Sequence, residues 1–399
     1  MDKIVPIDVT LNKAGGGISL VISSIRFPLA VLVVATHSFV LQNDLELLYH
    51  NPEAVVRYTE FIKLFIGKVL GNCPVPIFYF ISGYLFFNGV STHYKKSIYV
   101  NKLHKRVGSL LIPYLLWITI YILYILLQKT CGVVFHNKPI DGIVIFLTDK
   151  GLSAYWDCLV FPGLIDWAGS PHYQTAPLLG PLWYLRDLMI VCILSPLFFP
   201  LIRTSVWPLI AILIYASGMI PVWLSATMLP AFCFFTIGAW FQLKNRDFVF
   251  VIYKFRWIIC SIAVFLCAIT TFHGSNIGDR TGQLLFPFAI IFTSASLILL
   301  TSMVVQHYNA KKLMSLAPAT MFIYCSHYFV VQEIYKMTRM LFLHFSSIIN
   351  VPYIDLLTYL FTIAMCVLIC VMIYQLLNKY TPSLCNVLSG KMKYNHQSK

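Results

Sequence analysis

The chain has 399 residues, of which 59% are hydrophobic and only 11% are charged, and its mean hydropathy is +0.77. Soluble domains carry about 25% charged residues, so this composition excludes a soluble globular protein and predicts one that crosses the lipid bilayer repeatedly. The net charge of +14 would suggest nucleic acid as a partner of a soluble protein, but here it reports on topology and no nucleic-acid partner is expected. No CxxC, HExxH or HxxxH spacing occurs, so no bound metal is expected.

Apolar runs long enough to cross a bilayer recur along almost the whole chain. A span needs roughly 20 apolar residues, and we therefore predict an all-α fold, a polytopic transmembrane helical bundle of about ten helices. The predicted spans are residues 18–40, 70–90, 108–128, 180–202, 206–224, 227–243, 254–272, 283–304, 317–340 and 352–378. The predicted organisation is a cytoplasmic N-terminal segment (1–17), a transmembrane domain (18–378) and a cytoplasmic tail (379–399).

The distribution of basic residues predicts the orientation. With the N-terminus inside, about 18 of the 29 Lys and Arg residues lie in inner segments and about 7 in outer loops, which agrees with the excess of positive charge on the cytoplasmic side. Lys63 and Lys68 are among those assigned to outer loops. Both termini are therefore predicted to be cytoplasmic.

The first span carries two ionisable residues, Arg26 and His37. Eleven residues at a rise of 1.5 Å separate them by about 16 Å, and eleven steps of 100° bring them back to the same helix face. Charge inside a bilayer is costly, so such residues suggest function. The alternative is that Arg26 extends toward the inner surface and His37 is a packing residue.

The inner segment after the second span contains the densest positive charge, which includes Lys102, Lys105 and Arg106. Such a cluster is either a topology anchor with lipid-headgroup contacts or a site for the phosphates of a nucleotide-bearing donor.

The long outer connection, residues 129–179, contains aromatic and polar side chains that suit sugar rings or, equally, packing at the membrane surface. They are Tyr155, Trp156, Trp167, His172 and Tyr173. Loops of this length without a regular pattern are commonly functional.

The fourth span places Trp183, Arg186 and Asp187 just below the outer surface. Tryptophan at this depth is typical of the membrane interface. Arg186 either holds an anionic or hydroxyl-rich ligand or pairs with Asp187 or Glu333.

The ninth span holds His327, which is either a cavity residue or a hydrogen-bond tie between helices. Glu333, Lys336 and Arg339 are spaced to pair on one helix face, so an ion-pair network is the favoured interpretation for them.

Six segments, in this order, resemble the membrane-bound acyltransferase-3 family of the O-acetyltransferase type. Arg26 and His37 resemble its arginine followed eleven residues later by histidine. The other segments are FYFISGYLFF (its SG(F/Y) segment), the basic stretch ending in LLIPYLLW (its RxxR region), LWYLRDL (its W(F/Y)L segment), FFTIGAW (its FxxG segment) and FIYCSHYFVV (its IYxxH segment). The resemblance covers about residues 20–335.

This resemblance implies a multi-pass enzyme of the cell inner (plasma) membrane that transfers an acyl group, most often acetyl from acetyl-CoA, to a hydroxyl of a cell-envelope polysaccharide or lipid-linked glycan. His37 matches the family's essential histidine and Arg26 its paired arginine. Acetyl-CoA is expected as a substrate and no bound cofactor is expected. Where the family has RxxR, this chain has Lys102, Lys105 and Arg106, and lysine cannot form the bidentate phosphate contact that arginine forms.

The hypothesis that follows is direct transfer, with the nucleotide of CoA at the inner basic surface, Arg26 orienting the donor and His37 as general base. An imidazole has an ordinary pKa of about 6.5 and can accept the proton of a hydroxyl at neutral pH. Trp183, Arg186 and His327 are the candidate acceptor or cavity residues. The alternative function is a transporter or flippase for a lipid-linked glycan, in which the same ionisable residues line a path.

Overall fold

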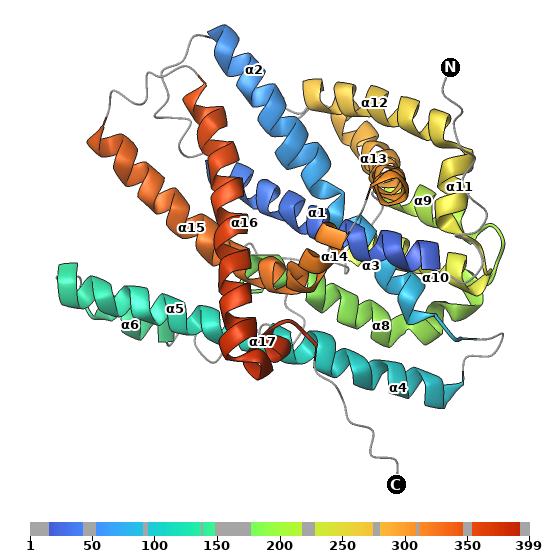
Figure 1. Ribbon diagram of the computed structural model, residues 1–399, viewed down its shortest axis with the longest axis horizontal. Coiled ribbons are helices and arrows are strands. Elements are labelled where there is room, and N and C mark those ends of the chain that lie inside the picture. Colours follow the sequence, from blue (N-terminus) through green and yellow to red (C-terminus); the bar gives the residue numbers. More distant parts are fainter. Residues whose placement is uncertain are drawn as a thin grey trace. The chain divides into compact units, whose positions relative to one another are not determined.

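The computed structural model describes residues 16–42, 53–90, 95–136, 139–147, 177–217, 228–273, 280–308, 311–345 and 353–391. All regular elements in these ranges are helices, and none is a strand, so the predicted all-α fold is confirmed (Figure 1). The chain forms two compact units, each described by itself. Unit 1 comprises Met1–Ile81, Asn245–Thr320 and Phe329–Ile369, and unit 2 comprises Ser82–Lys244, Met321–Tyr328 and Cys370–Lys399.

Unit 1 is built around the N-terminal helix α1. Its complete elements are α1 (Gly16–Gln42), α2 (Glu53–Leu64), the π-helical turn η3 (Phe65–Val69), the 3-10 turn η4 (Leu70–Asn72), α11 (Phe248–Lys254), α12 (Arg256–His273), α13 (Arg280–His307), α14 (Lys311–Leu316) and the 3-10 turn η8 (Ala317–Ala319). Helix α1 contacts η3, η4, α13, α14 and η8, and α12 packs along α13. Side chains of α1 are therefore surrounded by other helices along much of its length.

Unit 2 contains the basic helix and the helices that follow it. Its complete elements are α4 (Lys96–Arg106), the π-helical turn η5 (Val107–Leu111), α5 (Ile112–His136), α6 (Asp141–Phe146), the 3-10 turn η7 (Gly180–Leu182), α8 (Trp183–Ile202), α9 (Trp207–Ser217), α10 (Met228–Leu243) and α17 (Pro382–Leu388). Helices α3 (Pro74–Phe86), α15 (Thr320–His344) and α16 (Ile354–Tyr380) contribute to both units. The segment predicted as a tail includes α17. There the Leu388 carbonyl accepts a hydrogen bond from Trp117 Nε1 on α5 at 3.0 Å.

Seven helices in the described ranges are long and apolar enough to cross a membrane, or eight if the bent pair α11 and α12 is one span. Each of the ten predicted spans overlaps at least one helix within the described residues. The fifth and sixth correspond to α9 and α10, of 11 and 16 residues, which at 1.5 Å per residue are about 16 Å and 24 Å long and shorter than a hydrocarbon core of about 30 Å. The count of ten and the cytoplasmic termini thus stay predictions.

The second predicted span, 70–90, is displaced in the structure. The candidate span runs over Tyr58–Phe86 and passes through the π and 3-10 turns that precede Pro74. Lys63 and Lys68, assigned to an outer loop, lie within it, and Lys63 is only 3% exposed. Both lysines lie in helical segments, so their assignment to a loop was wrong. For Lys63 the reason is a carboxylate far away in the sequence that balances its charge, as described below.

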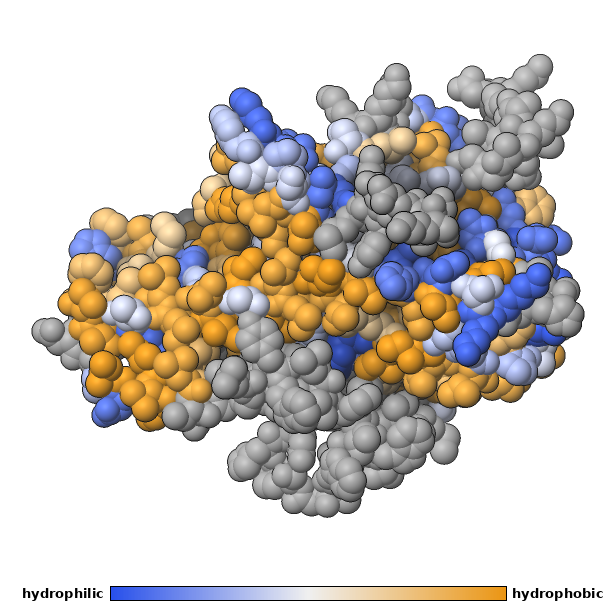
Figure 2. Space-filling model, turned by 90° about the horizontal axis from the view of Figure 1, so that it is seen from below, coloured by the Kyte–Doolittle hydropathy of each residue, from blue (hydrophilic) through white to orange (hydrophobic). Residues whose placement is uncertain are grey.

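The exposed hydrophobic side chains are consistent with a protein surrounded by lipid. Hydrophobic residues cover much of the face shown in Figure 2. On α12, Trp257, Val264 and Phe272 are each more than 70% exposed and lie about two or four turns apart on the helix. A large exposed apolar stripe is unfavourable in water and favourable against acyl chains.

Candidate functional site

The predicted catalytic residues lie on one covered face of α1. Arg26 and His37 are each partly buried. At 100° per residue, Leu29, Ala30 and Val33 point within about 60° of Arg26, and each of the three is 5% exposed or less. The face that carries the guanidinium and the imidazole is therefore covered by protein between these two residues and is not a lipid-facing stripe.

The predicted donor residues belong to α4 in unit 2, where Lys102 and Arg106 lie on one face of the helix and Lys105 lies on another. Lys102 and Arg106, one turn apart, converge on the ring of Phe86, with Lys102 Nζ 5.8 Å and Arg106 Cζ 5.7 Å from the ring centroid. Lys102 Nζ also donates a hydrogen bond to Asn88 O at 2.7 Å. Lys105 is exposed. Two of the three basic groups thus share one half-buried face, and the third points to solvent.

The support of this basic face comes from two of the family-like segments. A Cβ atom on Gly83 would collide with the Phe235 carbonyl oxygen, so glycine lets α3 approach the backbone of α10. The rings of Phe86 and Phe235 lie 5.8 Å apart, and those of Phe87 and Phe199 are stacked at 6.2 Å. The SG segment therefore positions, through Phe86, the surface on which Lys102 and Arg106 lie.

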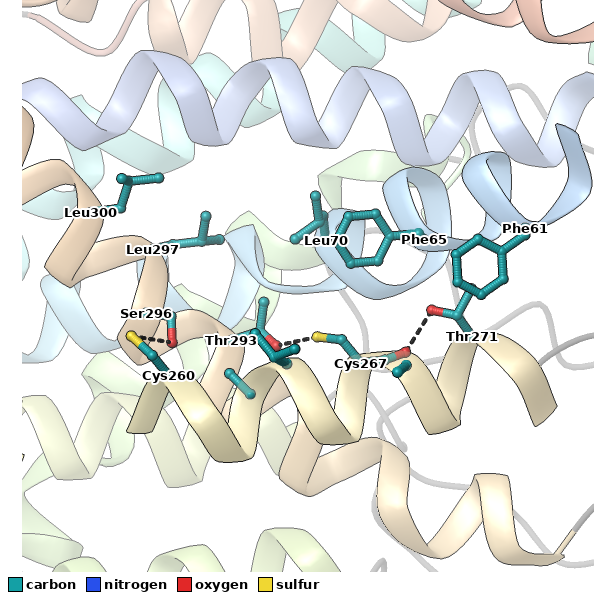
Figure 3. Close-up of a pocket in the computed structure, with 13 residues that line it drawn as sticks. Phe61, Phe65, Leu70, Cys260, Cys267, Thr271, Thr293, Ser296, Leu297 and Leu300 are labelled. Atoms are coloured by element: carbon teal, nitrogen blue, oxygen red, sulfur yellow. Dashed lines mark hydrogen bonds between the residues drawn. The ribbon is translucent and has the colours of Figure 1, made fainter. Parts of the chain in front are cut away.

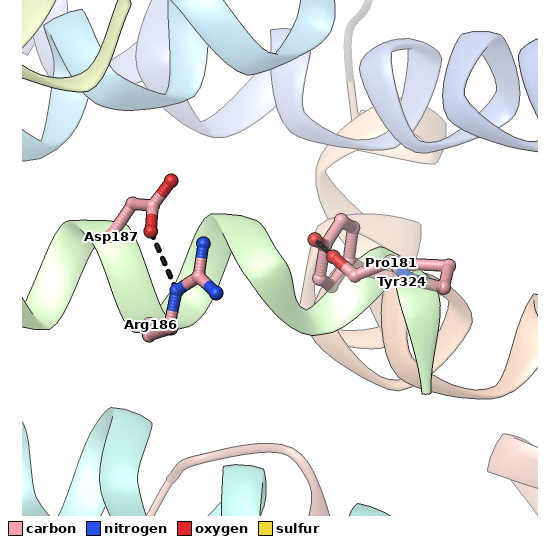
Figure 4. Close-up of polar contacts among 4 residues, drawn as sticks. All are labelled: Pro181, Arg186, Asp187 and Tyr324. Carbon is pink, nitrogen blue, oxygen red and sulfur yellow. Dashed lines mark hydrogen bonds and ion pairs between the residues drawn. The ribbon is translucent and has the colours of Figure 1, made fainter. Parts of the chain in front are cut away.

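A second contact joins the start of α8 to α15. The hydroxyl of Tyr324 donates a hydrogen bond to the carbonyl oxygen of Pro181 (Figure 4). The ring of Tyr324 also packs edge to face against Tyr184, with centroids 5.5 Å apart. Two segments that are 143 residues apart in sequence, LWYLRDL and FIYCSHYFVV, are thus adjacent within unit 2.

The predicted pairing of Arg186 with Asp187 is present. Arg186 Nε donates to Asp187 Oδ1 at 2.8 Å, and the two side chains are 9% and 0% exposed (Figure 4). The predicted pairing of Glu333 with Lys336 is also present, at 2.7 Å, with both side chains about half exposed. Trp183, the third acceptor candidate, is partly buried beside Tyr184 on α8.

His327 is fully buried, and its tautomer follows from its surroundings. Its Nδ1 lies 2.8 Å from Tyr324 O and 3.1 Å from Ile323 O. Both carbonyls can only accept, so Nδ1 carries the hydrogen and, in the neutral ring, Nε2 presents its lone pair. His327 can therefore accept a hydrogen bond or a proton at Nε2.

Sequence reasoning missed a buried ion pair in unit 1. Lys63 Nζ on α2 lies 3.3 Å from Asp355 Oδ2 on α16, and the side chains are 4% and 6% exposed. The apolar helical pattern around Lys63 and the position of Asp355 in the first turn of a long apolar helix were the available signals. The pairing itself joins positions far apart in sequence and has no local signal.

A cavity of about 460 Å³ in unit 1 has no His, Lys, Arg, Asp or Glu among the described residues that line it (Figure 3). It lies between α2 with its two turns, α12 and α13, and most of its surface is apolar. Its hydroxyls are internally bonded: Thr271 donates to Cys267 O at 2.7 Å, and Thr293 Oγ1 lies 2.9 Å from Cys267 Sγ. This lining suits a hydrocarbon chain and offers no acid or base for acyl transfer.

Two other expectations concern groups of residues. The aromatic and polar residues of the long outer loop, Tyr155 to Tyr173, lie outside the described residues. Among the described residues, no three His, Cys, Asp or Glu side chains are grouped so that they could hold a metal ion.

Comparison with known proteins agrees with the resemblance of the motifs. The model of a family described as an acyltransferase domain, acyltransferase-3, matches residues 22–375. The succinoglycan biosynthesis protein ExoH of Rhizobium meliloti (strain 1021) is 27% identical over 163 residues, which are 41% of this chain and 39% of that protein. The match thus spans about two fifths of ExoH. No solved structure matches the chain.

Proposed function

The chain belongs to the acyltransferase-3 family, and we propose that it transfers an acetyl group from cytoplasmic acetyl-CoA to a hydroxyl of a cell-envelope polysaccharide or lipid-linked glycan in the inner membrane. Family membership supports acyl transfer, and the name of the relative ExoH supports a glycan as acceptor. The observation that carries the proposal is the covered face of α1 with Arg26 and His37 in line.

In the proposed reaction, His37 is the general base. Its imidazole takes the proton of the acceptor hydroxyl while that oxygen attacks the thioester carbonyl of acetyl-CoA. The new ester C–O bond forms, the C–S bond breaks, and the departing CoA thiolate takes the proton from the imidazolium. A positioned base of this kind contributes roughly 10² to 10⁴ in rate.

The other predicted residues bind and orient the substrates. Lys102 and Arg106, which share a half-buried face of α4, are proposed to hold the phosphates of the donor, with Lys105 contributing long-range attraction. Arg26 is proposed to orient the donor and polarise its thioester carbonyl. Trp183, Arg186 and His327 are proposed to contact the acceptor.

The test is acetylation by cells and by membrane vesicles. A strain lacking the protein is complemented with the wild type, with His37→Ala or with His307→Ala, and the O-acetyl content of its purified envelope glycans is measured. His307 is exposed at the end of α13, so its replacement is the matched control. We expect His307→Ala to restore acetylation and His37→Ala to abolish it at equal amounts of protein in the membrane. Wild-type acetylation by His37→Ala would exclude His37 as the base.

A further inference from the structure

The Lys63–Asp355 pair is buried where an ion pair is expensive. Removing an ammonium and a carboxylate from water costs several kcal/mol per ion, and a well-packed apolar pair commonly holds two helices equally well. Asp355 Oδ1 is buried and, within the described part of the chain, has no hydrogen-bond partner. Burying this pair therefore costs free energy, and the need to join α2 to α16 does not by itself explain why the chain has an ion pair here.

One helical turn from the ion pair, α16 and the π-helical turn η3, which directly follows α2, contact α1. Tyr359, four residues after Asp355, is fully buried, and its hydroxyl donates to Ala35 O at 3.1 Å. Gly67, four residues after Lys63, lies so close to α1 that a Cβ there would be 2.6 Å from Phe39 Cβ. The same Cβ would be 3.0 Å from the Tyr359 hydroxyl, so α16 and η3 meet at this point.

These contacts hold the turn of α1 that carries His37. Ala35 and Phe39 precede and follow His37 by two residues, and two residues correspond to a rotation of about 200°. The contacts of Tyr359 and Gly67 are therefore on the side of α1 opposite to the imidazole. A change in how α2 and α16 meet would rotate or shift this turn and move the imidazole with it.

We propose that the Lys63–Asp355 pair positions His37. The pair fixes the register of α16 against α2, and the contacts of Tyr359 and Gly67 with α1 then fix the orientation of the turn that carries His37. A charge pair specifies register where apolar contacts allow sliding. Displacement of a reacting group by about 1 Å can lower a rate by roughly 10²-fold. The inference rests on the proposed role of His37 and makes Lys63 and Asp355 positioning residues that do not touch the substrates.

The experiment removes both charges together, because either single replacement leaves a buried charge without its partner. In membrane vesicles, Lys63→Met with Asp355→Asn is expected to lower kcat for acetyl transfer about 10-fold to 100-fold per folded molecule. The KM for acetyl-CoA is expected to remain at the wild-type value. The exchanged pair, Lys63→Asp with Asp355→Lys, is expected to recover part of the lost kcat. Glu333→Gln with Lys336→Met, in the exposed pair of the same unit, is the control and should leave both constants unchanged.

A second variant tests the link without altering any charge. Tyr359→Phe removes only the hydroxyl that bonds Ala35, and we expect a 3-fold to 10-fold lower kcat, an unchanged KM for acetyl-CoA and normal amounts of folded protein. Wild-type kcat in Tyr359→Phe, or in the neutral double variant, overturns the positioning role. If His37→Ala is inactive while these variants are fully active, only the positioning inference fails; if His37→Ala is active, the proposed function fails first.

Discussion

Replacement of Asp187 by leucine leaves the Arg186 guanidinium buried without the carboxylate that neutralises it. Arg186 is 8% exposed and its Nε lies 2.8 Å from Asp187 Oδ1, so little water is available to replace the lost partner. Two unit charges 4 Å apart attract by about 4 kcal/mol at an effective dielectric constant of about 20. This agrees with the roughly 3–5 kcal/mol that is lost when a buried pair is broken on one side.

We therefore expect Asp187→Leu to unfold far more readily than the wild type, with a midpoint of thermal unfolding lowered by roughly 5 °C or more in detergent micelles. The double variant Arg186→Met with Asp187→Leu removes both charges and should recover most of the loss, because no uncompensated ion remains. Tryptophan fluorescence of the purified proteins gives the midpoints. A double variant as unstable as the single one, or a single variant as stable as the wild type, would show that the pair is not energetically coupled.

The same double variant decides between the two interpretations of Arg186. If the guanidinium only pairs with Asp187, the folded double variant transfers acetyl groups with wild-type constants. If it also holds an anionic or hydroxyl-rich acceptor, the KM for the acceptor rises while the KM for acetyl-CoA stays constant. Loss of a charged hydrogen bond of roughly 1.5–3 kcal/mol corresponds to a rise of about 10-fold to 100-fold.

Two further predictions concern unit 2. Gly83→Ala places a methyl group against the Phe235 carbonyl and should destabilise the fold by the roughly 1–3 kcal/mol typical of overpacking. The yield of folded protein in fluorescence-detected size-exclusion chromatography should therefore fall for Gly83→Ala, but not for Gly180→Ala, which has open space around the added methyl group. Lys102→Met and Arg106→Met should each raise the KM for acetyl-CoA about 10-fold at low salt, and exposed Lys105→Met much less. Equal effects of all three replacements would contradict a specific phosphate site on one face of α4.

Hydropathy located most helices because a long apolar run of the local sequence is enough to specify them. Helices α1, α8, α13 and α16 follow from apolar runs of span length, and a run of this kind needs no partner to be recognised. The start of the second span was missed at Lys63, where a charge interrupts the apolar window. That charge is tolerated because Asp355 neutralises it, and a pairing between residues this far apart leaves no mark on either local pattern.

The candidate site was predictable where one helix determines it. The common face of Arg26 and His37, and that of Lys102 and Arg106, follow from 3.6 residues per turn. The contact of Tyr324 with Pro181 and the convergence of the basic residues on Phe86 depend on how helices pack, and neither could be derived from periodicity.

An ionisable residue within a span is a weak guide to function unless its partner is known. Arg186 with Asp187 and Lys63 with Asp355 are buried ion pairs, so each charge is balanced by its partner whether or not it has a further role. Imidazoles need no such counter-charge, because the neutral ring is itself a tolerable buried group that can still accept a proton. His327 donates from Nδ1 to carbonyl oxygens of its own helix, whereas His37 lies on the same face of α1 as the guanidinium of Arg26, which we propose to orient the donor. The chemistry of acyl transfer, which needs a base beside an oriented thioester, is therefore better matched by α1 than by α15.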